Sequence, residues 1–154
     1  MSKFYDSKED TRAHIRAVQV AMQKPIVKLM HRATLHDKSK LEPPEKAIFD
    51  RFTPVLKALK YGSDEYRSCL LEMKPALDHH YQVNSHHPEH YPDGIDGMSL
   101  LDLMEMICDW AAAHQRHDPP GTFEHSFKVN VPRFKIGPQL EKILRNTVRE
   151  MGWE

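Results

Sequence analysis

The sequence predicts an all-α protein, a compact helical bundle of about five helices. Apolar residues recur at helical spacing along nearly the whole chain, and Ser, Pro and Gly stand where helices would begin and end. No internal repeat or linker divides the 154 residues. A chain of this length is typical of one domain, so we expect a single domain over residues 1–154.

Each expected helix has its own start signal. Ser7, Ser63 and Ser99 can cap helices, while Pro43-Pro44 and Gly137-Pro138 open two others. The stretch from Ser99, SLLDLMEMICDWAAA, is apolar on nearly every side, which predicts a central helix. The expected helices cover residues 7–33, 43–60, 63–80, 99–113 and 137–152, with loop-like segments at 85–97 and 123–134.

Charge and composition exclude several classes of protein. Lys plus Arg is 22 and Asp plus Glu is 22, so the net charge is zero and binding of duplex nucleic acid is not expected. No run of 18 apolar residues and no signal-like N-terminus occurs, so we expect a cytoplasmic protein without a membrane span. Cys69 and Cys108 each lie in an apolar helical pattern and are predicted to be buried thiols, which suits a reducing compartment.

Histidine is the unusual feature of the composition. The chain has 11 histidines, and five of them fall between His79 and His90. Asp109 lies in the most apolar helix, where an unpaired carboxylate would cost several kcal/mol. A buried ion pair with Arg or Lys is one solution. The histidine surplus favours the other, a bound metal ion.

The doublet His36-Asp37 is a second candidate. Adjacent imidazole and carboxylate groups on a helical turn can bind one metal or bridge two, although such a dipeptide is often only a polar turn. Lys40 follows three residues after Asp37, where its ammonium group could meet a phosphate. A solvated lysine is the alternative. Asp37 and Lys40 are therefore the candidate catalytic residues.

A third candidate is the segment HHYQVNSHHPEH. Its histidines His80, His86 and His87 can converge on a metal at a helix-to-loop junction, with Asn84 placed to touch a substrate. His14, at the margin of the first apolar face, is the remaining predicted ligand. We expect four other polar residues of this kind to lie at the surface, with a role beside the site as the alternative: His79, His90, Glu45 and Glu89.

In this order, His14, His36-Asp37, His80, His86-His87 and Asp109 resemble the HD-domain superfamily of metal-dependent phosphohydrolases. The nearest likeness is to a small uncharacterised family of HD-like proteins from phages and bacteria. Three strings carry it: HDKSK, HYQVNSHHPEHY and LMEMICDW. The likeness covers about residues 11–116, which leaves 117–154 as a C-terminal extension with the last helix. The GYP tripeptide of the HD-GYP phosphodiesterases is missing.

The resemblance implies a fold, a site and an activity. One divalent metal would be held by His14, His36, Asp37 and Asp109, with Asp37 bridging to a second held by His80 and by His86 or His87. Mn, Fe, Co, Ni and Zn all suit such ligands. The expected reaction is hydrolysis of a small phosphate ester, such as a nucleotide, by a metal-activated water, with Lys40 and Asn84 contacting the substrate.

Two other functions use the same ligands. A di-iron oxygenase of the HD type would activate dioxygen instead of water. A non-catalytic protein would use the metal only as a structural support while it binds a partner, such as a host factor of a phage. Both remain open at this stage, and so does the formation of homo-oligomers.

Overall fold

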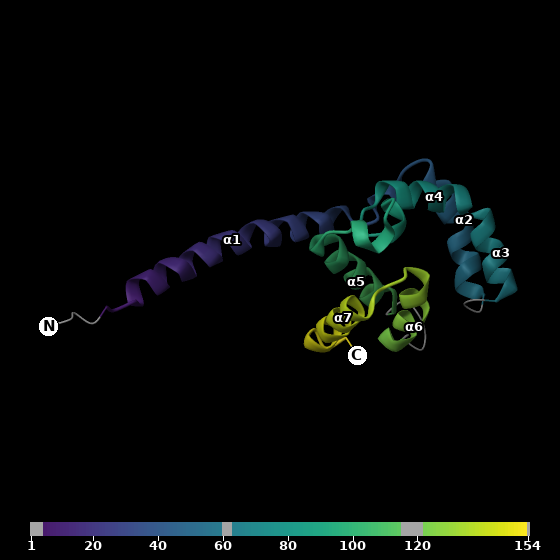
Figure 1. Cartoon of the computed structure of the whole chain (residues 1–154). Coiled ribbons are helices and arrows are strands. Elements are labelled where there is room, and N and C mark those ends of the chain that lie inside the picture. Colours follow the sequence, from purple (N-terminus) through teal and green to yellow (C-terminus); the bar gives the residue numbers. More distant parts are fainter. Residues whose placement is uncertain (1–4, 60–62, 115–121, 154) are drawn as a thin grey trace. The chain divides into compact units, whose positions relative to one another are not determined.

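The structure is a computed structural model that describes residues 5–59, 63–114 and 122–153. Within these residues every regular element is a helix, which confirms the all-α prediction (Figure 1). The described α-helices are α1 (Lys8–Leu35), α2 (Glu45–Ala58), α3 (Asp64–Glu72), α4 (Lys74–Val83), α5 (Leu100–His114), α6 (Phe123–Arg133) and α7 (Pro138–Glu150). Three short 3-10 helices join them: η1 (Lys38–Leu41), η2 (Pro88–His90) and η3 (Gly94–Gly97).

The described residues thus form seven α-helices rather than about five, for two local reasons. The helix expected over 63–80 is divided at Met73, because Pro75 lacks an N–H group and belongs in a first helical turn. The segment expected to be irregular, 123–134, contains α6. Phe123 and Phe127, one turn apart, are both buried, and the Thr122 side chain accepts a hydrogen bond from the His125 N–H at 3.4 Å.

The chain divides into two compact units, Met1–Leu35 and His36–Glu154. In the first unit α1 is one continuous helix that includes Pro25, and none of its residues is buried. Its apolar residues Ile15 and Met22 are exposed. The prediction of a single domain over residues 1–154 stays a prediction.

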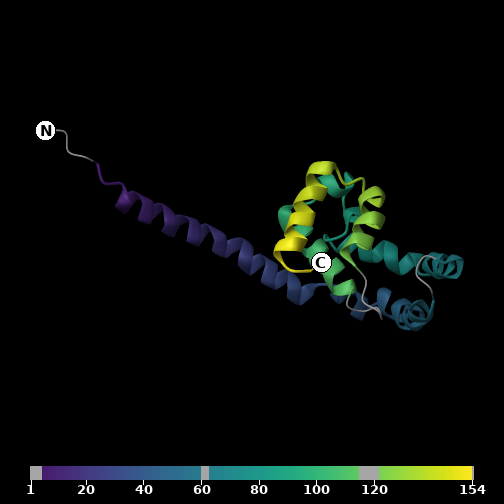
Figure 2. The ribbon, with the colours of Figure 1, turned by 90° about the horizontal axis from the view of Figure 1, so that it is seen from below.

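The second unit has two apolar cores. Phe52, Cys69 and Met73 form one between α2, α3 and α4. The other joins α5, α6 and α7, and Met106 and Ile107 lie at its centre. Figures 1 and 2 show α6 and α7 side by side at the C-terminal end of the chain. Burial of Cys69 is confirmed, whereas the expected burial of Cys108 is wrong, because α5 turns this side chain outward.

Asp102 connects the loop between α4 and α5 to the start of α5 through hydrogen bonds. Its carboxylate accepts hydrogen bonds from the Ser99 N–H at 2.8 Å, the Ser99 hydroxyl at 2.6 Å and the Ser85 hydroxyl at 2.9 Å. The Asp102 N–H donates back to the Ser99 hydroxyl at 3.3 Å, which completes a capping box. Ser85 immediately precedes the histidines of the loop, so this network fixes where they begin.

No helix among the described residues has both the length and the apolar character needed to cross a membrane.

Asp102 predicts a pH dependence of stability. Burial alone would raise the pKa of this carboxyl group, but hydrogen bonds from Ser99 and Ser85 outweigh burial and lower the pKa from 3.8 to about 2. A carboxyl group whose pKa is lower in the folded than in the unfolded protein stabilises the fold at any pH above its unfolded-state pKa. This stabilisation is lost as the pH falls toward the folded-state pKa of about 2. We expect Asp102→Asn to lower the free energy of unfolding by about 1–3 kcal/mol at pH 7. Urea unfolding should show that difference shrinking between pH 4 and pH 2; a constant difference would contradict the assignment.

Candidate metal centre

The site begins with a turn between α1 and η1. Asp37 has a left-handed backbone (φ 57°), which Asp tolerates better than most residues, and it stands at the N-cap position of η1 without a capping hydrogen bond from its side chain. This turn brings two neighbouring side chains to one place: His36 Nε2 lies 3.7 Å from Asp37 Oδ2. Lys40, one turn of η1 later, donates a hydrogen bond to the same oxygen at 2.6 Å.

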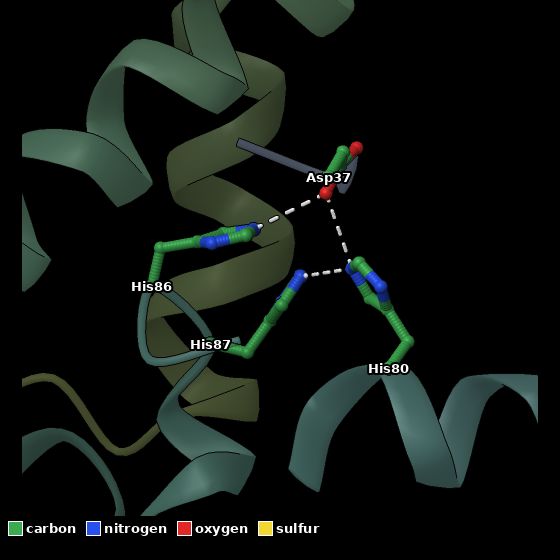
Figure 3. Close-up of side chains that lie close together, drawn as sticks. All are labelled: Asp37, His80, His86 and His87. Carbon is green, nitrogen blue, oxygen red and sulfur yellow. Dashed lines mark hydrogen bonds and ion pairs between the residues drawn. The ribbon is translucent and has the colours of Figure 1, made fainter. Parts of the chain in front are cut away.

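Two histidines approach the other oxygen of Asp37, and a third histidine contacts one of them (Figure 3). His80 extends from α4 and places Nε2 at 3.2 Å from Asp37 Oδ1. His86, from the loop after α4, places Nε2 at 3.6 Å from the same oxygen. His87 Nε2 lies 3.0 Å from His80 Nε2. Asp37, His80, His86 and His87 therefore form one set whose ligand atoms lie within 4.8 Å of one another.

Two atoms at the centre of this set lack a hydrogen-bond partner among the described residues. They are Asp37 Oδ1 and His86 Nε2, and both are buried. A buried polar atom without a partner costs about 1–3 kcal/mol. Because both atoms are lone-pair donors, a cation between them would satisfy both.

A second set shares Asp37 and is more open. It combines His36, Asp37 and Asp109, with His36 Nε2 at 3.5 Å from Asp109 Oδ1. The side chains of His36 and Asp109 are 24% and 25% exposed, against 2% for His80 and His86. The cluster is thus closed on the side of the buried histidines and accessible on the side of Asp109 and Lys40.

The outward nitrogens of the histidines contact two further carboxylates. Glu45, on α2, contacts His79 Nδ1 at 2.7 Å and His80 Nδ1 at 3.0 Å. Glu105, on α5, contacts His36 Nδ1 at 2.9 Å and lies 3.3 Å from His86 Nδ1. Three of the rings, those of His36, His80 and His86, therefore present Nε2 to the cluster.

The carboxylates around His36, Asp37 and Asp109, on the accessible side of the cluster, favour positive charge there. The carboxylates of Asp109 and Glu105 raise the pKa of His36 to about 10. Burial would raise the pKa of Asp37, yet contacts with His80 and Lys40 hold it well below its ordinary value. Burial would likewise raise the pKa of Asp109, but His36 keeps it low. The carboxylates of Asp37 and Asp109 therefore remain charged. A proton on His36 balances their negative charge, and a bound metal ion could do the same.

On the closed side of the cluster, the pKa of a histidine is lowered instead of raised. Burial and the neighbouring His86 and His80 lower the pKa of His87 to about 3. His87 is therefore neutral at pH 7, which is the form of imidazole that binds metals. Oxygen and nitrogen donors without a thiolate suit first-row divalent transition metals. The residues present thus fit a metal ion of this class.

The structure brings together six of the seven predicted ligands. His36, Asp37, His80, His86, His87 and Asp109 all belong to the two sets described above. His14 lies in the first unit, on α1, with an exposed side chain, and its role as a ligand stays a prediction. Asn84, the predicted substrate contact, donates hydrogen bonds from Nδ2 to the Ser39 hydroxyl at 2.8 Å and to the His80 carbonyl at 2.8 Å.

The sequence reasoning missed the carboxylates behind the histidines. Glu45 and His79 were expected at the surface, with a role beside the site as the alternative, but Glu45 is fully buried and His79 is half-buried against it. Glu105 was not singled out. A signal for it existed: Asp102, Glu105 and Asp109 recur at spacings of three and four, which is one face of an otherwise apolar helix. Glu45 has no comparable signal.

Comparison with known protein families assigns the chain to one of them. A family described only as a family of unknown function, DUF5662, matches residues 3–150. The chain belongs to DUF5662. No curated protein and no solved structure matches it. The resemblance to HD-domain proteins stays a prediction, and the chemistry of this DUF5662 member is argued from its own side chains.

Metal binding to this cluster should stabilise the fold. A ligand at 100 times its dissociation constant adds about 2.7 kcal/mol, which corresponds to roughly 5–10 °C in Tm for a domain of this size. We expect Zn²⁺ or Co²⁺ to raise the Tm of chelator-treated protein by this amount. His86→Ala should abolish the rise, whereas His125→Ala, at an exposed histidine of α6, should keep it. An equal rise in both variants would place the metal elsewhere.

Proposed function

We propose that this protein is a metal-dependent phosphohydrolase that acts on a small phosphorylated molecule, with nucleotides as the first class to test. In this proposal His36, Asp37 and Asp109 would hold one divalent metal. His80, His86 and His87 would hold a second, and Asp37 would be a ligand in both sets. The protein would act in the cytoplasm, or in the host cytoplasm if a phage encodes it.

The observation that carries the proposal is the double use of the Asp37 carboxylate. Oδ1 faces the buried histidines, while Oδ2 accepts a hydrogen bond from Lys40 at 2.6 Å. The Lys40 ammonium group therefore stands beside a ligand oxygen, on the accessible side of the cluster. A phosphate that reached this side would meet metal ligands and a positive charge together, an arrangement that suits phosphoryl chemistry.

Each residue then has a defined task. A bound divalent metal would polarise a phosphoryl oxygen and lower the pKa of a coordinated water from 15.7 toward about 7. Lys40 donates hydrogen bonds to a non-bridging phosphate oxygen when it leaves Asp37. Phe49 holds the lysine in place, since the Lys40 ammonium lies 5.2 Å from the centre of its ring. Asn84 supports His80 at its backbone carbonyl, 2.8 Å from Asn84 Nδ2, and at its ring, where Nδ1 lies 3.0 Å from the same nitrogen.

Asp37 gives the direct test of the activity. We expect purified protein supplied with Mn²⁺ or Co²⁺ to release inorganic phosphate from at least one member of a panel of nucleoside mono-, di- and triphosphates. Asp37→Asn keeps the size of the side chain and its tolerance of a left-handed backbone, but it removes the ligand charge. Turnover should fall at least about 100-fold, by analogy with the loss of other transition-state contacts.

Asp50→Asn is the matched control, because Asp50 is an exposed carboxylate on α2 that pairs with Lys46. It should leave turnover unchanged. Metal-loaded protein that hydrolyses no member of the panel would overturn the proposal. Bound iron with a visible absorption band and no phosphate release would indicate the oxygenase instead.

Lys40 gives a second test, of the phosphate contact itself. We expect Lys40→Met to lower kcat about 10²–10³-fold, because a charged donor to the transition state is lost. Metal affinity should change little, since Lys40 is not a ligand. Lys38→Met, at the exposed neighbouring lysine, is the control. Equal losses in the two variants, measured by steady-state phosphate release, would remove Lys40 from the mechanism.

A further inference from the structure

We infer that Glu45 and Glu105 are positioning residues of the metal centre, each of which aims a pair of histidines through their Nδ1 atoms. The inference rests on the metal centre of the proposed function and adds to it the groups that set metal affinity. The sequence did not single out Glu105, and for Glu45 it indicated a role beside the site only as the alternative to a surface position. They come from different helices, Glu45 from α2 and Glu105 from α5.

Glu45 uses both of its oxygens. Oε1 lies 2.7 Å from His79 Nδ1, while Oε2 lies 3.0 Å from His80 Nδ1 and accepts from the Ser39 hydroxyl at 3.0 Å. The residue is fully buried, so water does not replace these contacts. A charged carboxylate at 0% exposure is costly unless several donors face it, and here three do.

Glu105 connects two segments that are far apart in the chain. One oxygen, Oε1, lies 2.9 Å from His36 Nδ1 and 3.3 Å from His86 Nδ1. Glu105, His36 and His86 could themselves be read as a ligand set. However, 2.9 Å is an ordinary N–H···O distance, and the Nε2 atoms of both rings face Asp37. Glu105 therefore acts through the histidines rather than as a ligand.

The physical effect is the choice of tautomer. A neutral imidazole carries one N–H, and a carboxylate at Nδ1 keeps the proton there, which leaves the Nε2 lone pair for a metal. The same contact fixes the ring and makes Nε2 a stronger donor. Loss of such a partner typically costs 10–100-fold in metal affinity. Glu105 would supply this effect to His36 and His86. Glu45 would supply it to His80, whose Nδ1 also lies 3.1 Å from the Ser39 hydroxyl and 3.0 Å from Asn84 Nδ2, and the charge of the carboxylate favours the proton on Nδ1.

The test measures metal binding rather than activity. The full chain is stripped with chelator and titrated with Co²⁺, and affinity and the visible Co²⁺ spectrum are recorded for the wild type and for Glu45 and Glu105 variants. We expect Glu45→Ala and Glu105→Ala to weaken binding 10–100-fold and to change the spectrum, which reports ligand geometry. Glu72→Gln, at an exposed carboxylate of α3, should match the wild type.

The glutamine variants separate positioning from simple support of the fold. Glu105→Gln keeps one oxygen that can accept from both histidines, so it should recover most of the affinity. In Glu45→Gln one of the two accepting oxygens becomes an NH₂ group, so recovery should be smaller. Circular dichroism of the metal-free proteins checks that they fold. If an alanine variant does not fold, the Co²⁺ affinity of the glutamine variant tests the positioning role instead.

The outcomes separate the inference from the proposed function. Variants that bind Co²⁺ within twofold of the wild type, with the same spectrum, would overturn the inference. Wild-type protein that binds no Co²⁺ would overturn both the inference and the proposed function. Wild-type protein that binds Co²⁺ but releases no phosphate would overturn the activity alone, and the positioning roles would stand if the variants weaken binding as expected.

Discussion

Buried negative charge opposite imidazole nitrogen is the constraint on which the second unit depends. Glu45 is fully buried, Glu105 and Asp37 are partly buried, and at the site the three carboxylates contact histidines, a serine and one lysine. Carboxylates in such a place are stable only when donors surround them. The packing of α2, α4 and α5 brings the histidines to these carboxylates, and the loop between α4 and α5 supplies His86.

The two apolar cores explain how this arrangement is held. One core supports α2 and α4, which carry Glu45 and His80. The other supports α5, whose polar edge carries Glu105 and Asp109. The turn at Asp37 and the loop at His86 contact both groups of helices through their side chains. A site built between two rigid helical groups keeps its ligand geometry while one side stays accessible.

The division between closed and accessible ligands gives the centre two kinds of position. His80 and His86 are almost without solvent contact, which under the proposed function would suit a firmly held metal. The side chains of His36, Asp109 and Lys40 are about one quarter exposed, which under the same proposal would let a substrate reach them. Asp37 belongs to both. The membership in DUF5662 leaves the chemistry open, so these side chains carry the functional argument.

The sequence by itself determined the helical class, most helix starts, and six of the residues that gather at the site, because apolar spacing, capping residues and the histidine surplus are local signals. It did not reveal that Pro75 divides one helix, that two phenylalanines pull 123–133 into a core as α6, or that α5 turns Cys108 outward. The largest difference from the structure concerned the burial of Glu45, which was expected at the surface. Whether a glutamate is exposed or buried depends on what packs over it, and His79, His80 and Ser39 reach it only once α2, α4 and η1 have packed together. Local pattern fixes which residues are available, whereas tertiary packing decides which nitrogen of each histidine points inward.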